Sequence, residues 1–270
     1  MSSTQLMVPA WEKDMVYLVQ FPRMGNVPSL SPFALKAETW LRMAKVPYKN
    51  VNNNLKRMSS KGQIPFVEVN GREIADSNHI MDELKKLFDL DIDKNLSDRD
   101  GADMMAYHSL IEDTLRWQDW YFRTKDARYI LEADGQPQWN FVTGLFVKYW
   151  MMPRFMKEYQ GRCVAQGVGR ETPEEVIEGA KRNLKAVSNF IGEKHYILGD
   201  KPTSLDATAF GHLLMFYYRL GMEEFKDYMD KECKLLVDYL MRLKEEFWKD
   251  WDVVVTTHTL DSTNDANVNK

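Results

Sequence analysis

Three pairs of neighbouring residues in the first third of the chain have side chains or backbone groups that could do chemistry. Ser31-Pro32 and Asp76-Ser77 stand where helices are predicted to begin, and Ile64-Pro65 opens a short alternating run. The start of a helix presents unpaired N–H groups that favour a carboxylate, and the Ser77 hydroxyl can add a hydrogen bond. The Asp76 carboxylate can hold an ammonium group. The second pair therefore suits a ligand with both charges, although a plain helix cap uses the same residue types.

The elements that carry these pairs predict a small α/β domain. Residues 16–21 form an apolar run ended by Pro22, which predicts a buried strand. Ser31-Pro32 then caps a helix that stops near Pro47, because apolar residues recur at helical spacing after it. Residues 48–52 predict a strand at the edge of the sheet.

A hairpin and a second helix complete this domain. Residues 64–69 alternate like a strand, and 72–75 return as its partner after Asn70-Gly71, a pair that tolerates the positive φ of a type I′ turn. Asp76-Ser77 then begins a helix with one apolar stripe. The predicted order is βαβββα, with a mixed sheet.

From Ser97 onward the sequence predicts helices only. These are expected at 100–122, 141–159, 173–191, 205–220 and 222–248, and Thr203 with Asp206 forms a capping box before the fourth. The polar end, 256–270, predicts a disordered tail. The expected organisation is a leader (1–13), an α/β domain (14–90), a linker (91–99), an all-helical domain (100–255) and the tail.

Composition excludes several classes of function. The 270 residues carry a net charge of −4 and no basic stripe, which argues against nucleic acid as a partner. No secretory signal opens the chain, so a cytoplasmic location is expected. The most apolar stretch, Trp139–Phe155, is interrupted by Lys148 and Arg154 and is too short to span a membrane; it predicts a buried helix. Cys163 and Cys233 stand apart, and no histidine has the spacing of a metal ligand, so no metal is expected.

The order of these elements, with Pro65 at the head of the third strand, resembles the glutathione S-transferases. The resemblance implies a thioredoxin-like N-terminal domain, a cis Ile64–Pro65 bond and an all-α C-terminal domain. The segment Leu198–Asp206 also resembles the transferase motif at the start of the buried helix of the C-terminal domain. It implies glutathione as co-substrate, with the Ile64 backbone pairing with the cysteinyl part. Asp76 and Ser77 would hold the γ-glutamyl group.

Ser31-Pro32-Phe33 resembles the corresponding segment of the tau and omega classes. Ser31 would take the place of the catalytic hydroxyl and donate a hydrogen bond to the glutathione thiolate, while Ser29 and Tyr17 are lesser candidates. Equally, Ser31 could be a helix cap alone. Lys61, with Lys56 and Arg57, could pair with the glycyl carboxylate.

The segments 28–42 and 60–66 resemble most the failed axon connections and metaxin-related branch, which includes nematode cadmium-responsive proteins. Two hypotheses follow. In the first, the chain conjugates glutathione to small hydrophobic electrophiles in detoxification or stress response, with the aromatic residues Trp117, Trp120 and Tyr121 beside the electrophile. In the second, a non-catalytic transferase-like protein binds a protein partner in axon development or at an organelle. The family also implies a homodimer.

Overall fold

The N-terminal domain is built on one mixed sheet. The structure is a computed structural model that describes residues 6–53, 57–135 and 141–260. Its strands run in the order β2-β1-β3-β4, and β2 is parallel to β1 whereas β3 and β4 are antiparallel to their neighbours. The strands are β1 (Val16–Gln20), β2 (Tyr48–Asn52), β3 (Phe66–Val69) and β4 (Arg72–Ala75). The predicted α/β fold is confirmed, and the third strand begins two residues later than expected.

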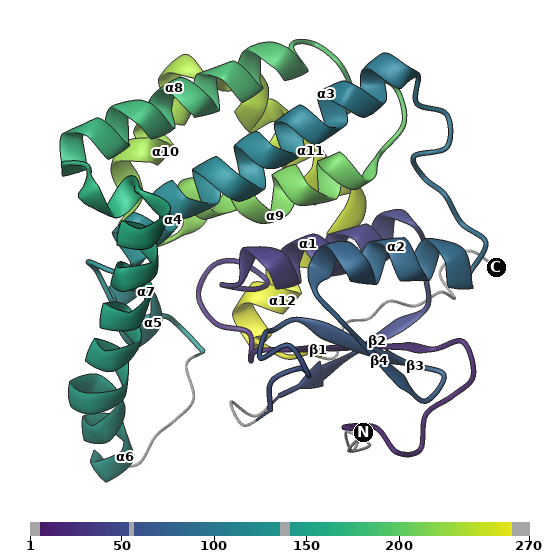
Figure 1. Ribbon diagram of the computed structural model, residues 1–270, viewed down its shortest axis with the longest axis horizontal. Coiled ribbons are helices and arrows are strands. Elements are labelled where there is room, and N and C mark those ends of the chain that lie inside the picture. Colours follow the sequence, from purple (N-terminus) through teal and green to yellow (C-terminus); the bar gives the residue numbers. More distant parts are fainter. Residues whose placement is uncertain (1–5, 54–56, 136–140, 261–270) are drawn as a thin grey trace.

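Two helices cover one face of this sheet. They are α1 (Pro32–Met43) and α2 (Ser77–Leu87), which lie between the sheet and the helical domain (Figure 1). Ser31 caps α1 by accepting a hydrogen bond from the Ala34 N–H, and Asp76 caps α2. The turn between β3 and β4 has positive φ at Asn70 and Gly71, as the hairpin signal predicts.

The N-terminal segment covers part of the opposite face of the sheet. Met7 packs against a small cluster there, and the N–H groups of Met7 and Val8 donate to the buried Glu68 carboxylate at 2.7 and 2.9 Å. The cluster contains Val19, Ile64, Phe66 and Ala75. No helix forms in the described part of 53–65, namely residue 53 and residues 57–65, so the N-terminal segment covers a face that would otherwise be more exposed.

The rest of the chain is helical. A long first helix is interrupted by a π-helical segment, and a second π-helical segment joins α6 to α7, which lies along one edge of the molecule (Figure 1). The elements are α3 (Asp98–Ser109), η1 (Leu110–Leu115), α4 (Arg116–Arg123), α5 (Arg128–Leu131), α6 (Phe141–Phe146), η2 (Val147–Met151), α7 (Met152–Gln166), η3 (Val168–Arg170), α8 (Pro173–Ile191), α9 (Ser204–Tyr218), α10 (Glu223–Glu232), α11 (Lys234–Phe247) and α12 (Trp251–Thr257).

Three predictions about this region need correction. The helix expected over 222–248 is two helices, because the chain leaves helical geometry at Cys233. The predicted tail begins inside α12, and the Thr259 carbonyl accepts a hydrogen bond from Arg23 Nε; residues 261–270 lie outside the described residues. The stretch Trp139–Phe155 is helical from Phe141, but among its described side chains only Val147 and Met152 are buried, and Trp139 lies outside the described residues.

The buried helix α9 is held at its start by the predicted capping residues. Asp206 Oδ2 accepts hydrogen bonds from the N–H and the hydroxyl of Thr203, each at 2.7 Å. Its other oxygen accepts from the Ile197 N–H and the Tyr239 hydroxyl. All four acceptor positions of a fully buried carboxylate are therefore used.

The two domains share one hydrophobic core. Buried side chains of the sheet and α1 belong to the same cluster as those of α9 and α11, among them Leu18, Trp40 and Phe210. The backbones of α1 and α9 approach closely, because a Cβ added at Gly211 would lie 2.6 Å from the Pro32 carbonyl oxygen. The helical domain is thus a fixed support for the start of α1.

Candidate functional site

Strand pairing brings the residues singled out from the sequence to one edge of the sheet. Val19 of β1 pairs with Phe66, and Phe66 pairs with Ala75 of β4. The next residues outward are therefore Pro65 and Asp76, which stand at the same level beside the carboxyl end of β1. The Ile64–Pro65 peptide is cis, as the family resemblance implies.

Two residues at this edge present polar groups without partners. Ile64 is buried, and neither its N–H nor its C=O makes a hydrogen bond to another residue in the part of the chain that the structure describes. Ser77 is 5% exposed, and its hydroxyl likewise has no partner among the described residues. Because buried polar groups are nearly always paired in folded proteins, these groups can serve an external ligand.

Asp76 adopts a backbone conformation that L-residues seldom use. Its φ is 87° and its ψ is 128°, and its Oδ1 accepts hydrogen bonds from the N–H groups of Asn78 and His79. The Oδ2 atom has no hydrogen-bond partner among residues 6–53, 57–135 and 141–260. Such strained residues cluster at ligand-binding sites, and here the strain turns Ser77 inward while one carboxylate oxygen stays available.

Ser31 is partly exposed at the start of α1. Its Oγ accepts the Ala34 N–H at 3.3 Å, so its hydroxyl proton is free to be donated. Ser29 is buried, and its Oγ accepts the Ser31 N–H. The Tyr17 hydroxyl instead accepts the Glu12 N–H on the N-terminal segment, away from the helix start. Of the three hydroxyl candidates, Ser31 alone combines partial exposure with a position at a helix start.

The long loop before Ser31 is held in place from both sides. Arg23 is 1% exposed and donates to the Pro28 carbonyl, the Glu38 carboxylate and the Thr259 carbonyl. On the other side, the buried Arg123 donates to the Leu30 carbonyl at 2.8 Å. The position of Ser31 is therefore fixed by two buried guanidinium groups that the sequence patterns did not reveal.

The cations expected near the glycyl end of the ligand have different surroundings. Lys61 is exposed in the loop before Ile64, and no ion pair joins it to a described residue. Arg57 pairs with Glu68 at 3.2 Å and with Glu73 at 2.9 Å, so its charge is already compensated. Lys56 lies outside the described residues.

A buried ionic network lies beside the start of α2. The ammonium of Lys36, on α1, contacts both Asn78 Oδ1 and Glu112 Oε2 at 2.5 Å, and Lys36 is completely buried. Glu112 lies on the π-helical segment η1, and His108 and His212 approach its Oε2 at 3.4 and 3.5 Å. The sequence did not reveal this network, because its residues are far apart along the chain. Each of them, taken alone, is an ordinary residue of a helix.

Burial lowers the pKa of Lys36, and the adjacent Glu112 carboxylate opposes that shift. Burial would raise the pKa of Glu112, but the neighbouring His212 ring and the charge of Lys36 hold it well below its usual range. Burial lowers the pKa of both His108 and His212, so that both rings are neutral at pH 7. Lys36 and Glu112 therefore form a charge-compensated pair next to the first turn of α2.

The aromatic residues expected to contact an electrophile are divided between surface and core. Tyr121 is 3% exposed, and its hydroxyl donates to the Glu171 carbonyl, so it is a core residue. Trp117 is partly exposed and lies under the Arg116 guanidinium at 4.1 Å, while Trp120 stacks on Tyr159. Arg116 also lies over Phe33, which connects Trp117 to the start of α1.

The two cysteines are unsuited to redox chemistry. Both are buried free thiols, and burial raises the pKa of Cys163 to about 11. Because the thiolate is the reactive form, such a thiol is inert near neutral pH. Among the described residues no group of His, Cys, Asp or Glu side chains could hold a metal ion.

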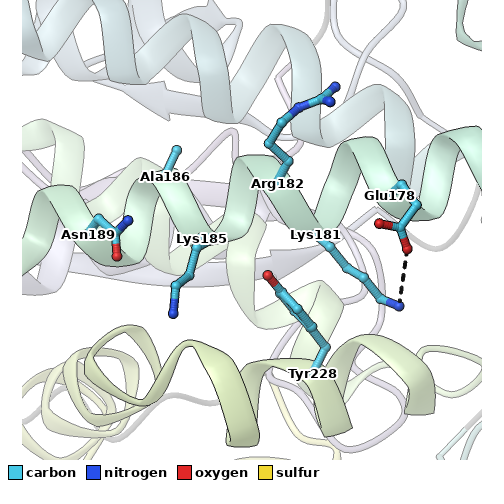
Figure 2. Close-up of a pocket in the computed structure, with 7 residues that line it drawn as sticks. All are labelled: Glu178, Lys181, Arg182, Lys185, Ala186, Asn189 and Tyr228. Atoms are coloured by element: carbon cyan, nitrogen blue, oxygen red, sulfur yellow. Dashed lines mark ion pairs between the residues drawn. The ribbon is translucent and has the colours of Figure 1, made fainter.

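A separate hollow of about 550 Å³ lies in the helical domain between α8 and α10. Figure 2 shows Lys181, Lys185 and Tyr228 at its walls. Lys181 pairs with Glu224 at 2.9 Å, and Lys185 donates to the Glu232 carbonyl. Since these lysines already have partners, we assign the hollow no ligand.

Comparison with known families agrees with this architecture. Residues 32–129 match the family model of the glutathione S-transferase N-terminal domain, and residues 180–243 match that of the C-terminal domain. The chain belongs to the glutathione S-transferase superfamily, and the thioredoxin-like and helical domains predicted from the sequence are confirmed.

Within the superfamily, the chain is similar to failed axon connections of Drosophila melanogaster. The two are 35% identical over 259 residues, which is 91% of this chain but 61% of that protein. It is 27% identical to isoprene-epoxide--glutathione S-transferase of Rhodococcus sp., over 89% of this chain and 96% of that protein. It is also 26% identical to mouse metaxin-2, over 81% and 82% of the two chains. The predicted relationship to the failed axon connections and metaxin branch is confirmed.

Solved structures share the fold at low sequence identity. A glutathione S-transferase of Ceriporiopsis subvermispora in complex with glutathione superposes with a TM-score of 0.58, at 17% identity, over 85% of this chain and 96% of that chain. None of the helices in the described residues is both long and apolar enough to cross a membrane.

Proposed function

We propose that the chain binds glutathione at the edge of the sheet formed by Ile64, Pro65, Asp76 and Ser77. The observation that carries the proposal is the set of unpaired polar groups there: the Ile64 backbone, the Ser77 hydroxyl and Asp76 Oδ2. A tripeptide with an extended backbone, a free carboxylate and an ammonium group would pair with all three.

Each part of glutathione has a proposed partner. The cysteinyl amide and carbonyl pair with the C=O and N–H of Ile64. The γ-glutamyl carboxylate accepts from Ser77 at the start of α2, where the positive end of the helix dipole favours a carboxylate. Its ammonium lies against Asp76 Oδ2. Lys61 is the proposed partner of the glycyl carboxylate, because it is exposed next to Ile64 and pairs with no described residue.

We propose conjugation to a small hydrophobic electrophile as the reaction. The Ser31 hydroxyl donates to the glutathione thiolate, which lowers the thiol pKa by about one to two units if that bond contributes about 1.5–3 kcal/mol. The thiolate sulfur bonds to the electrophilic carbon, whose leaving group or epoxide oxygen takes the released electron pair. The similarity to a glutathione transferase over nearly its whole length supports this, and detoxification in the cytoplasm is the proposed setting.

Calorimetric titration with glutathione tests the binding step. Wild type should bind in the micromolar to low millimolar range, and Ser77→Ala should bind at least about tenfold more weakly, because one hydrogen bond to a charged group is lost. Ser97→Ala is the matched control, since Ser97 caps α3 in an exposed position outside the proposed site. Equal affinities for wild type and Ser77→Ala would refute the γ-glutamyl assignment.

Turnover of a general electrophile tests the chemical step. Ser31→Ala should keep glutathione affinity within a few-fold, but should raise the pKa seen in the rate profile and lower the rate at neutral pH by about ten- to a hundredfold. Turnover that is unchanged in Ser31→Ala would remove Ser31 from catalysis while leaving the binding proposal intact.

A non-catalytic role in binding a protein partner is the second candidate. The observation that favours it is the network of Lys36, Glu112 and His212, which occupies the space between the domains next to α2 with buried side chains. In this case glutathione would bind, if at all, without turnover by either wild type or Ser31→Ala. The similarity to failed axon connections supports this candidate.

A further inference from the structure

Among the described residues, several exposed apolar side chains gather on the helix that precedes α7. We call this patch the α6–η2 surface. It consists of Val142, Leu145, Phe146, Tyr149, Trp150 and Met151, whose exposed fractions range from 40% to 74%. Figure 1 shows α6 at the far end of this helical column, away from the bundle of α8 to α11. The sequence predicts a buried helix here, and the fold leaves it uncovered.

The clustering of these side chains sets them apart from other exposed apolar residues. Val142, Phe146, Tyr149 and Trp150 recur at helical spacing, so they gather on one side of a single helix. By contrast, Met105 on α3 is 76% exposed but stands alone. A contiguous exposed patch of aromatic and aliphatic side chains marks a surface that contacts a protein or a membrane. Single exposed apolar residues are common on soluble proteins and indicate no such contact.

Cations accompany the aromatic rings on this helix. Lys148 Nζ lies 5.4 Å from the ring centre of Tyr149, and the Arg154 guanidinium lies 5.7 Å from that of Trp150. Residues 141–166 contain four cations (Lys148, Arg154, Lys157 and Arg162) and one anion (Glu158), a net charge of +3. The whole chain has a net charge of −4, so this helix is a local basic region on an acidic protein.

We propose that the α6–η2 surface docks peripherally on a lipid bilayer rich in anionic headgroups. Tryptophan and tyrosine favour the boundary between headgroups and acyl chains, because their rings are apolar and their N–H or O–H groups reach water. Lysine and arginine beside them reach the phosphate level with their charged ends while their stems stay on the apolar side. Aromatic and aliphatic side chains enter the boundary, and Lys148 and Arg154 attract the anionic lipid.

Charge favours a bilayer over a second copy of the chain. A contact between two copies through this surface would bring together two helices that each carry a net charge of +3, so like charges would repel. An anionic membrane would instead attract the net positive charge of the helix, on which Arg162 already pairs with Glu158 at 2.6 Å.

Sedimentation with lipid vesicles tests this proposal. Full-length wild type should pellet with vesicles of phosphatidylcholine containing about 30% phosphatidylserine, and binding to phosphatidylcholine alone should be at least about tenfold weaker. The Phe146→Glu/Trp150→Glu variant should lose binding by at least about tenfold, since the apolar insertion is removed. Both positions are largely exposed, so circular dichroism should show an unchanged fold.

Two controls make the result specific to this surface. Met105→Glu changes an equally exposed apolar side chain on α3 and should bind like wild type. Lys148→Glu/Arg154→Glu should abolish the preference for phosphatidylserine, whereas the matched charge reversal Lys231→Glu/Lys249→Glu, at exposed lysines of other elements, should preserve it. The proposal is overturned if wild type does not bind the anionic vesicles, or if Phe146→Glu/Trp150→Glu binds as well as wild type. It is also overturned if the patch instead forms a dimer that this variant dissociates.

Discussion

At the residue scale, the candidate site depends on groups that the fold leaves unpaired. Ile64 and Ser77 are buried with free hydrogen-bonding groups, and Asp76 uses one carboxylate oxygen to cap α2 while the other stays available. Outside the candidate site, buried charged side chains have hydrogen-bond partners. Glu38 is fully buried and accepts hydrogen bonds from Arg23 and Gln20 at 2.7 and 2.9 Å.

The low pKa of the buried Glu38 carboxyl predicts that the free energy of unfolding falls in acid. Burial by itself would raise the pKa of its carboxyl, but Arg23 and Arg42 lower that pKa to about 2. Because the folded-state pKa lies below the unfolded value, the stabilisation is present above about pH 4.5 and is lost as the pH falls toward about 2. The loss should reach up to about 3 kcal/mol of the free energy of unfolding.

Denaturation by urea at several pH values checks this prediction. Glu38→Gln should be less stable than wild type at pH 7, and the difference between the two proteins should shrink as the pH falls below 4.5. A constant difference from pH 7 to pH 2.5 would contradict the assignment of a low pKa to Glu38.

At the element scale, helix starts and the hairpin were the features that sequence reasoning located best. Ser31 and Asp76 stand at the positions where capping residues are expected, since their side chains accept hydrogen bonds from N–H groups of the first helical turn. At the start of α9 the predicted pair is also in place, and Asp206 accepts from the Thr203 N–H. The hairpin followed from Asn70-Gly71 for the same local reason.

Features set by long-range packing escaped prediction. The break at Cys233 follows no proline or glycine, and the burial of Lys36 depends on Glu112, which is distant in sequence. The apolar content of residues 139–155 predicted burial, but apolar periodicity does not reveal which surface covers a helix. The unpaired groups of the candidate site could be suspected from the family motif, whereas the ionic network beside them could not.

The contact of α1 with α9 gives a prediction about packing. Gly211→Ala should destabilise the protein by about 1–3 kcal/mol, because the new methyl group would meet the Pro32 carbonyl oxygen at 2.6 Å and the backbone of Lys36. Gly161→Ala is the matched control, since its added Cβ meets nothing within 4 Å and it lies within α7. That variant should gain about 0.5–1 kcal/mol from helix propensity. Thermal and urea denaturation would measure both, and a neutral Gly211→Ala would contradict the close approach.

At the scale of the whole molecule, the two domains share a core and are joined by buried ionic contacts. Lys36 of the N-terminal domain pairs with Glu112 of the helical domain, and Arg42 pairs with Asp250 at 2.6 Å. Buried pairs of this kind fix the relative position of two parts, because removing one partner leaves an uncompensated charge. Domain coupling therefore supports the start of α2, where the glutathione carboxylate is proposed to bind.

The Lys36–Glu112 pair predicts an asymmetric response to mutation. Glu112→Ala should destabilise the folded chain by about 3–5 kcal/mol, since the Lys36 ammonium would stay buried without its anion. Lys36→Met/Glu112→Leu removes both charges and should recover most of this loss. Urea denaturation would measure the difference, and a double variant no more stable than Glu112→Ala would contradict this account of the pair.

The proposed glutathione site is tested by calorimetric titration of wild type with glutathione and with cysteinylglycine, which lacks the γ-glutamyl group. Wild type should bind glutathione saturably. Cysteinylglycine should bind at least about a hundredfold more weakly, because Ser77 and Asp76 lose their partners. Absence of heat with millimolar glutathione, or equal affinity for the two peptides, would contradict the proposed site.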